Sequence, residues 1–159
     1  MNNLPTTATE EDHLALLAWL NSSAACFWMK QVFYPKASGI NDVSVEKGRA
    51  EANRYEFAGT GMLPLPVPAR VVDAKGSGSS LVAMAREIET LTMARAAADP
   101  YAVITAWALD GEISLSNALH AAKKAADMAF HTMVVLQEEI DWSFYADLEL
   151  CKRRPVMYG

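Results

Sequence analysis

The chain has 159 residues, of which 52% are hydrophobic and 21% are charged, and its formal net charge is −5. This apolar content argues against a wholly disordered chain and is enough to build one domain or two small subdomains. The acidic balance is not typical of a free-standing DNA-binding protein, because such proteins usually present a basic surface to the phosphates.

The first predicted element is a helix over residues 10–33 that is apolar on nearly every side. Thr9 can cap this helix, and three acidic residues in its first turn favour the positive end of the helix dipole. Residues 14–29 carry no charge, but these 16 residues fall short of the roughly 20 that a transmembrane helix needs. We therefore expect no membrane partner and a buried helix that Phe27 and Trp28 anchor in the core.

The middle of the chain is predicted to hold a long loop followed by short strands. Residues 37–53 show only weak patterning and read as the loop, and residues 55–57 alternate as a short strand. Residues 63–68 have proline at every second position, so they form an extended, edge-like crossing. Residues 70–72 are predicted to add a brief strand, and the Gly- and Ser-rich residues 74–80 read as a flexible linker.

The second half is predicted to be a helical hairpin or small bundle. An Ala-rich amphipathic helix is expected over residues 81–98, and Ser114 is expected to cap a long helix over residues 115–140. Asp141 is expected to cap a final short helix over residues 142–148. The predicted fold class is thus mostly α with a small β element (α+β): a buried helix and short strands, then helices.

Three stretches of the sequence, taken in order, resemble one enzyme family. They are LNSS, ACFW and KQV within residues 20–32, YEFAGT at residues 55–60 leading to PLP, and QEEIDW at residues 137–142, with Tyr145 just beyond. They resemble the target-recognition region of large adenine-specific DNA methyltransferases. The likeness is greatest to the PglX-type enzymes of bacteriophage-exclusion (BREX) defence systems.

The resemblance implies a piece of such an enzyme without its catalytic domain. Adenine methyltransferases hold S-adenosylmethionine at a glycine-rich turn and grip the flipped base with an Asn/Asp-Pro-Pro-aromatic tetrapeptide. The sequence contains no Pro-Pro pair and no convincing cofactor turn, so we expect no cofactor and no turnover in this chain alone. The implied organisation is a partial target-recognition domain over residues 1–75 and a helical spacer over residues 76–159. The implied partners are DNA and a methyltransferase catalytic domain or other defence-system subunits.

Basic residues that could contact phosphate are concentrated in the first half of the chain. Residues 30–75 include seven basic and five acidic residues, whereas residues 76–151 include four basic and eleven acidic residues. The second half would therefore be repelled by a polyanion. The candidate DNA-binding residues are Lys30, Lys36, Lys47, Arg49 and Arg54. The alternative is that these side chains are ordinary solvated charges, because acidic residues are interspersed among them.

No metal site or catalytic centre is predicted. His13, His120 and His131 have no Cys or His one helical turn away that would complete a metal site. Cys26 is surrounded by apolar residues, which is typical of an inert thiol. Cys26 and Cys151 lie far apart and no signal peptide is recognisable, so we expect free thiols in the cytoplasm.

Two other functions are compatible with the sequence. The first is a small helical protein–protein interaction module that dimerises through the Ala-rich stripes of its helices. The second is an independent enzyme of unknown chemistry. The stretches that resemble methyltransferases favour DNA recognition, and the acidic second half favours the interaction module.

Overall fold

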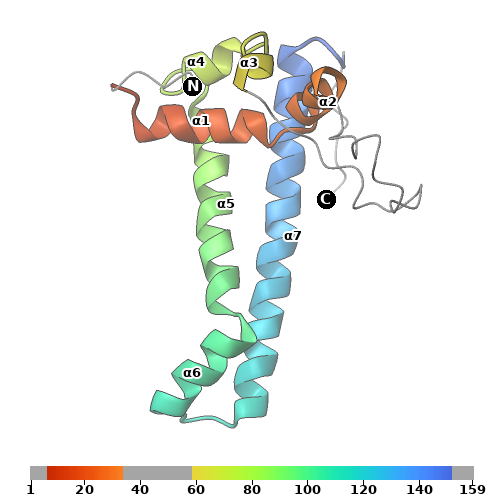
Figure 1. The fold of residues 1–159 in the computed structure, drawn as a ribbon. Helices are drawn as coiled ribbons and strands as arrows, with labels where there is room; N and C mark the ends of the chain where they lie inside the picture. The colour runs from red at the N-terminus through yellow and green to blue at the C-terminus, as the bar shows by residue number, and fades with distance from the viewer. Residues whose placement is uncertain (1–6, 34–58, 152–159) are drawn as a thin grey trace, which may run out of the picture.

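The computed structural model describes residues 7–33 and 59–151, and within these two ranges every regular element is a helix (Figure 1). The described ranges contain no strand, so the predicted α+β class is wrong. The predicted strand at residues 70–72 is part of a helical turn, and the one at residues 55–57 lies outside the described residues. The helices are α1 (Glu10–Leu20), α2 (Ser23–Val32), α3 (Gly59–Met62), α4 (Ala69–Val72), α5 (Ser79–Ala97), α6 (Pro100–Asp110) and α7 (Leu115–Asp147).

Helices α5 and α7 run side by side in opposite directions as a long two-helix shaft (Figure 1). Helix α6 lies at the far end of the shaft, and α1 to α4 lie across its near end as a head. Helix α1 packs against both α5 and α4, and α2 contacts α7. The predicted division into residues 1–75 and 76–159 therefore runs through a region where helices of both parts share one core.

The first helix is interrupted at a polar pair, so the single predicted helix over residues 10–33 is wrong. Helix α1 ends at Leu20, and the Asn21 side-chain amide donates to the carbonyl oxygen of Leu17 at 3.1 Å. Ser22 is fully buried with extended backbone, and its hydroxyl accepts from the Ala25 N–H at 3.2 Å. The serine thus starts a new helix, because an N-cap hydroxyl satisfies an amide that has no partner within the helix.

The core is centred on two aromatic side chains from opposite ends of the sequence. Trp19 of α1 and Phe144 of α7 are both fully buried, and their ring centroids lie 4.8 Å apart in an edge-to-face arrangement. Phe27 is 67% exposed and Trp28 is only partly buried, so the prediction that they anchor the core is wrong. The aliphatic residues buried around the two rings include Leu14, Val71, Leu81, Val82 and Ile140.

An ordered turn, rather than a flexible linker, connects α4 to α5. The Asp73 carboxylate accepts from the Gly76 N–H at 3.2 Å and from both the N–H and the hydroxyl of Ser77, at 2.8 and 3.0 Å. These bonds lower the pKa of Asp73, the Ser77 N–H contributing most. Gly78 is buried, and a Cβ atom there would collide with the carbonyl oxygen of Arg70. The turn therefore fixes how the shaft leaves the head.

Helices α6 and α7 each begin at a side-chain cap that lies next to them in sequence. Asp99 accepts from the Tyr101 N–H at 2.9 Å to start α6, and Ser114 accepts from the Asn117 N–H at 3.3 Å to start α7. The prediction that Ser114 caps a long helix is confirmed. Helix α7 then continues without a break through Asp141, so the predicted separate helix over residues 142–148 is wrong. Among the described helices, none combines the length and apolar character needed to cross a membrane.

Candidate functional site

The predicted DNA-binding residues follow α2, and the structure describes one of them. Lys30 lies in the last turn of α2, is exposed, and forms no ion pair with a described residue. The other four candidates, Lys36, Lys47, Arg49 and Arg54, lie outside the described residues, so their joint arrangement stays a prediction. Lys30 marks the point on the head from which this basic stretch continues.

The other described basic residues of the head are engaged in ion pairs. A guanidinium nitrogen of Arg70 lies 2.9 Å from a carboxylate oxygen of Asp147, which ties α4 to the end of α7. Lys75 reaches Glu11 at 4.0 Å. In the described part of α1 to α4 and the following turn, Lys30 is therefore the basic side chain that remains available for a phosphate.

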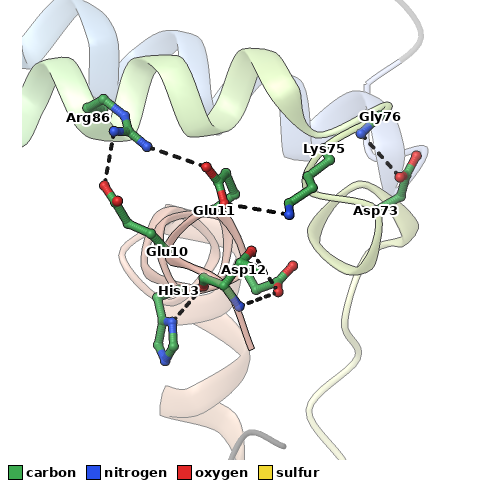
Figure 2. Close-up of polar contacts among 9 residues, drawn as sticks. Glu10, Glu11, Asp12, His13, Asp73, Lys75, Gly76 and Arg86 are labelled. Atoms are coloured by element: carbon green, nitrogen blue, oxygen red, sulfur yellow. Dashed lines mark hydrogen bonds and ion pairs between the residues drawn. The ribbon is translucent and has the colours of Figure 1, made fainter. Parts of the chain in front are cut away.

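A cluster of charges joins the start of α1 to α5 (Figure 2). The Arg86 guanidinium lies 3.0 Å from Glu10 and 3.9 Å from Glu11. The pKa of Glu11 is lowered, chiefly by a backbone hydrogen bond and then by the Thr9 side chain, with Lys75 and Arg86 contributing less. These side chains are largely exposed, so each pair contributes little stability. Their effect is to set the position of α1 on α5.

Thr9 is the N-cap residue of α1, as predicted, and Asp12 at the third helical position forms a capping box with it. Its carboxylate accepts from the Thr9 N–H at 2.8 Å and from the Thr9 hydroxyl at 3.0 Å (Figure 2). These two bonds lower the pKa of Asp12, with the backbone bond contributing most. One carboxylate oxygen of Asp12 is thus engaged in starting the helix.

Asn21, Ser23, Gln137 and Asp141 form a second polar cluster, the α2–α7 joint. The Ser23 N–H donates to one oxygen of Asp141 at 2.8 Å, and the Ser23 hydroxyl donates to the other at 2.6 Å. The Gln137 side-chain amide approaches the Asn21 carbonyl oxygen and Asp141, both at 3.4 Å. Asp141 therefore caps the N-terminus of α2 from another helix, where a negative charge also favours the helix dipole.

The α2–α7 joint brings together two of the three stretches that carry the family resemblance. LNSS supplies Asn21 and Ser23, and QEEIDW supplies Gln137 and Asp141, although 118 residues separate Ser23 from Asp141. The sequence instead predicted Asp141 to cap a separate helix over residues 142–148. The sequence feature that could have indicated the contact with α2 is the polar interruption at residues 21–23 of an otherwise apolar run. The geometry assigns these residues to holding the head on the shaft.

The described residues contain no arrangement suited to catalysis or to binding a metal ion. No group of three or more His, Cys, Asp or Glu in them is placed to hold a metal. Cys26 is a partly buried free thiol and Cys151 an exposed one. His120 and His131 are both exposed on α7, and the Asp127 carboxylate beside them is bonded to Lys123 at 2.7 Å, a contact that lowers the pKa of Asp127.

Two apolar hollows lie at opposite ends of the molecule. One of about 410 Å³ lies on the head, and one of about 710 Å³ lies where α5, α6 and α7 meet. The head hollow is lined by Leu16, Val67, Val71 and Val72 beside Asp12. The other is lined mainly by alanines around Trp107, whose indole N–H donates to the Ile113 carbonyl oxygen at 2.7 Å. Each hollow has one carboxylate in its lining, Asp12 in the head hollow and Glu112 in the other.

Comparison with known proteins identifies one related enzyme. The chain is 36% identical to the adenine-specific methyltransferase PglX of Streptomyces coelicolor over an alignment of 143 residues. This alignment covers 87% of the chain. The chain spans about 10% of the length of that relative. No family model matches the chain, and no solved structure matches it. The resemblance to PglX-type methyltransferases is confirmed, and the chain corresponds to a small part of such a protein.

Proposed function

We propose that the chain is a DNA-recognition part of an adenine-specific DNA methyltransferase that acts in a BREX-type phage-defence or restriction–modification system. The observation that carries the proposal is the 36% identity to PglX over an alignment of 143 residues that covers 87% of the chain. S-adenosylmethionine and the catalytic domain would be supplied by the rest of the enzyme.

The proposed role of the head is to hold basic side chains against the DNA backbone. The α2–α7 joint and the α1–α5 ion pairs fix α1 and α2 on the shaft, and the last turn of α2 carries the exposed Lys30. The candidate residues Lys36, Lys47, Arg49 and Arg54 follow it in sequence. Such cations make phosphate contacts, which position a protein on DNA without specifying the base sequence.

The proposed role of the shaft is to separate the head from neighbouring parts of the enzyme. Residues 76–151, which include the whole shaft, carry seven more acidic than basic residues, so a duplex lying along α5 and α7 would be repelled. The shaft also consists of two helices over most of its length, which gives it extent without a large core. It therefore suits a spacer better than a DNA-binding surface.

A salt titration of DNA binding tests the proposal. Fluorescence anisotropy with a labelled duplex at several salt concentrations should give a dissociation constant that rises with salt. Lys30→Ala should reduce the slope of log K against log salt by up to about 0.9, the value for one phosphate contact. Lys123→Ala is the matched control, because this lysine is also exposed but already pairs with Asp127 at 2.7 Å. It should change neither affinity nor slope.

Two outcomes would contradict the proposal. The first is that the wild-type chain shows no salt-dependent binding at any concentration. The second is that Lys123→Ala weakens binding more than Lys30→Ala, since the phosphate-facing surface would then lie on the shaft.

A further inference from the structure

Helix α7 has an outer face that no described element covers. Its inner face packs along α5 and contains the buried Ala129. On the outer face, Met128 is 62% exposed and Val135 is 49% exposed, on the same side of the helix and two turns apart. The residues of the Ala-rich stripe that the sequence suggested for dimerisation are half-buried or buried within the fold, so the stripe is not free for a partner. Its residues are Leu119, Ala122, Ala126, Ala129, Met133 and Leu136.

The residues of the outer face recur at the spacing of a coiled-coil seam. The intervals between them alternate between three and four residues, which is the repeat that keeps one side of a helix against a second helix. The seam spans roughly 30 Å of helix at 1.5 Å per residue. We call this set the outer seam. Its members are Ala121, Lys124, Met128, His131, Val135, Glu138 and Trp142.

The charges and side-chain sizes along the outer seam are complementary to those of a second outer seam that runs in the opposite direction. Lys124 precedes the exposed His131 by seven residues and Glu138 follows it by seven, and neither ion has a partner in the described part of the chain. Two α7 helices that run antiparallel and cross at His131 would place Lys124 of each copy against Glu138 of the other. The same rotation carries position 128 onto position 134, so Met128 would lie within one residue of the level of the partner's Val135. A parallel pairing would instead place lysine against lysine and glutamate against glutamate.

We propose that the outer seam of α7 binds a second copy of this chain, forming an antiparallel, twofold-symmetric dimer. The small Ala121 would then lie within one residue of the level of the partner's large Trp142 at both ends of the interface, which keeps the spacing between the helices even. Polar residues within the seam fix the register and the direction of pairing at some cost in affinity. The proposal does not depend on the proposed DNA-recognition function, because it uses only the outer face of the shaft.

Sedimentation velocity over protein concentrations from about 1 to 200 μM tests the proposal, since a seam with this polar content should give a dissociation constant in the micromolar range. The wild-type chain should pass from monomer to dimer. Lys124→Glu and Glu138→Lys should each weaken dimerisation at least tenfold, because each places like charges together twice. The double variant with both changes should recover to within about threefold of wild type.

Glu87→Lys is the matched control, because this glutamate is exposed on α5 and lies outside the seam. It should leave the dimer unchanged. The proposal is overturned if the wild-type chain stays monomeric throughout, if either single charge reversal leaves the dimer intact, or if the double variant fails to recover. Circular dichroism of each variant, which should match wild type at these exposed positions, separates loss of pairing from loss of folding. No DNA is present, so a negative result leaves the DNA-binding proposal standing.

Discussion

Truncation of Trp19 should destabilise the fold more than truncation of any other aromatic residue on α1 or α2. Its side chain is fully buried and packs edge-to-face on Phe144, so Trp19→Ala removes this ring contact from the core. Substitutions of this kind cost about 3–5 kcal/mol. Against a total of about 5–15 kcal/mol for a typical domain, that loss is a large fraction of the stability.

Two further variants make the test of Trp19 specific. Trp19→Phe keeps a ring and removes an indole N–H that has no hydrogen-bond partner in the described structure. Its cost should therefore be about 1–2 kcal/mol, because loss of an unpaired donor offsets part of the lost volume. Phe27→Ala is the matched control on α2 and should cost at most about 0.5 kcal/mol, because Phe27 is 67% exposed.

Urea denaturation followed by circular dichroism at 222 nm gives all three free energies of unfolding. Thermal melts should agree, with a fall of roughly 2–4 °C for each kcal/mol in a chain of this length. If Phe27→Ala proved as costly as Trp19→Ala, the assignment of the core to Trp19 and Phe144 would be refuted.

Two other predictions concern the polar contacts of the head. Asp141→Ala should lower the free energy of unfolding by about 0.5–2 kcal/mol, because α2 loses its cap. Ser143→Ala, two residues along, should lower it by less. If urea denaturation showed Ser143→Ala to be the more costly change, α2 would not depend on α7. The pKa values of Asp12 and Asp73 are lowered in the folded state, so the unfolded chain binds more protons than the folded one below about pH 4. The free energy of unfolding should therefore have its full value above that pH range and fall as the pH drops through the lowered pKa values. Asp12→Asn with Asp73→Asn should flatten this dependence, and an unchanged pH profile of the double variant would contradict the assignment.

The helices of the shaft could be predicted from local signals. The amphipathic pattern over residues 81–98 corresponds to α5, and the Ser114 side chain bonds to an amide three residues ahead, as its sequence context predicts. These features depend on residues within one or two turns of each other. The predicted strand at residues 70–72 does not form, because packing Val71 into the core beside α1 stabilises the helical turn more than the two adjacent valines favour a strand.

The joints of the head could not be predicted in the same way. Ser23 and Asp141 are 118 residues apart, and nothing local to either residue identifies the other as its partner. The break in the first helix follows from the same cause. A serine pair in an apolar run is compatible with a continuous helix until the buried Ser22 cap and the distant carboxylate give the backbone amides of α2 better partners.

The family resemblance was carried in part by these joint residues. LNSS and QEEIDW lie on opposite sides of one contact, which holds the head on the shaft. The candidate DNA-binding residues lie between the two stretches in sequence, and four of the five lie outside the described residues. DNA recognition therefore has to be tested on the basic stretch itself.

The location of bound DNA is the most direct test of the DNA-recognition proposal. A duplex carrying photoreactive groups on its phosphate backbone can be cross-linked to the wild-type chain, and the modified peptides identified by mass spectrometry. The proposal predicts that the cross-links fall between Lys30 and Arg54 and disappear at high salt. Cross-links concentrated on α5 or α7, or none at any salt concentration, would contradict it.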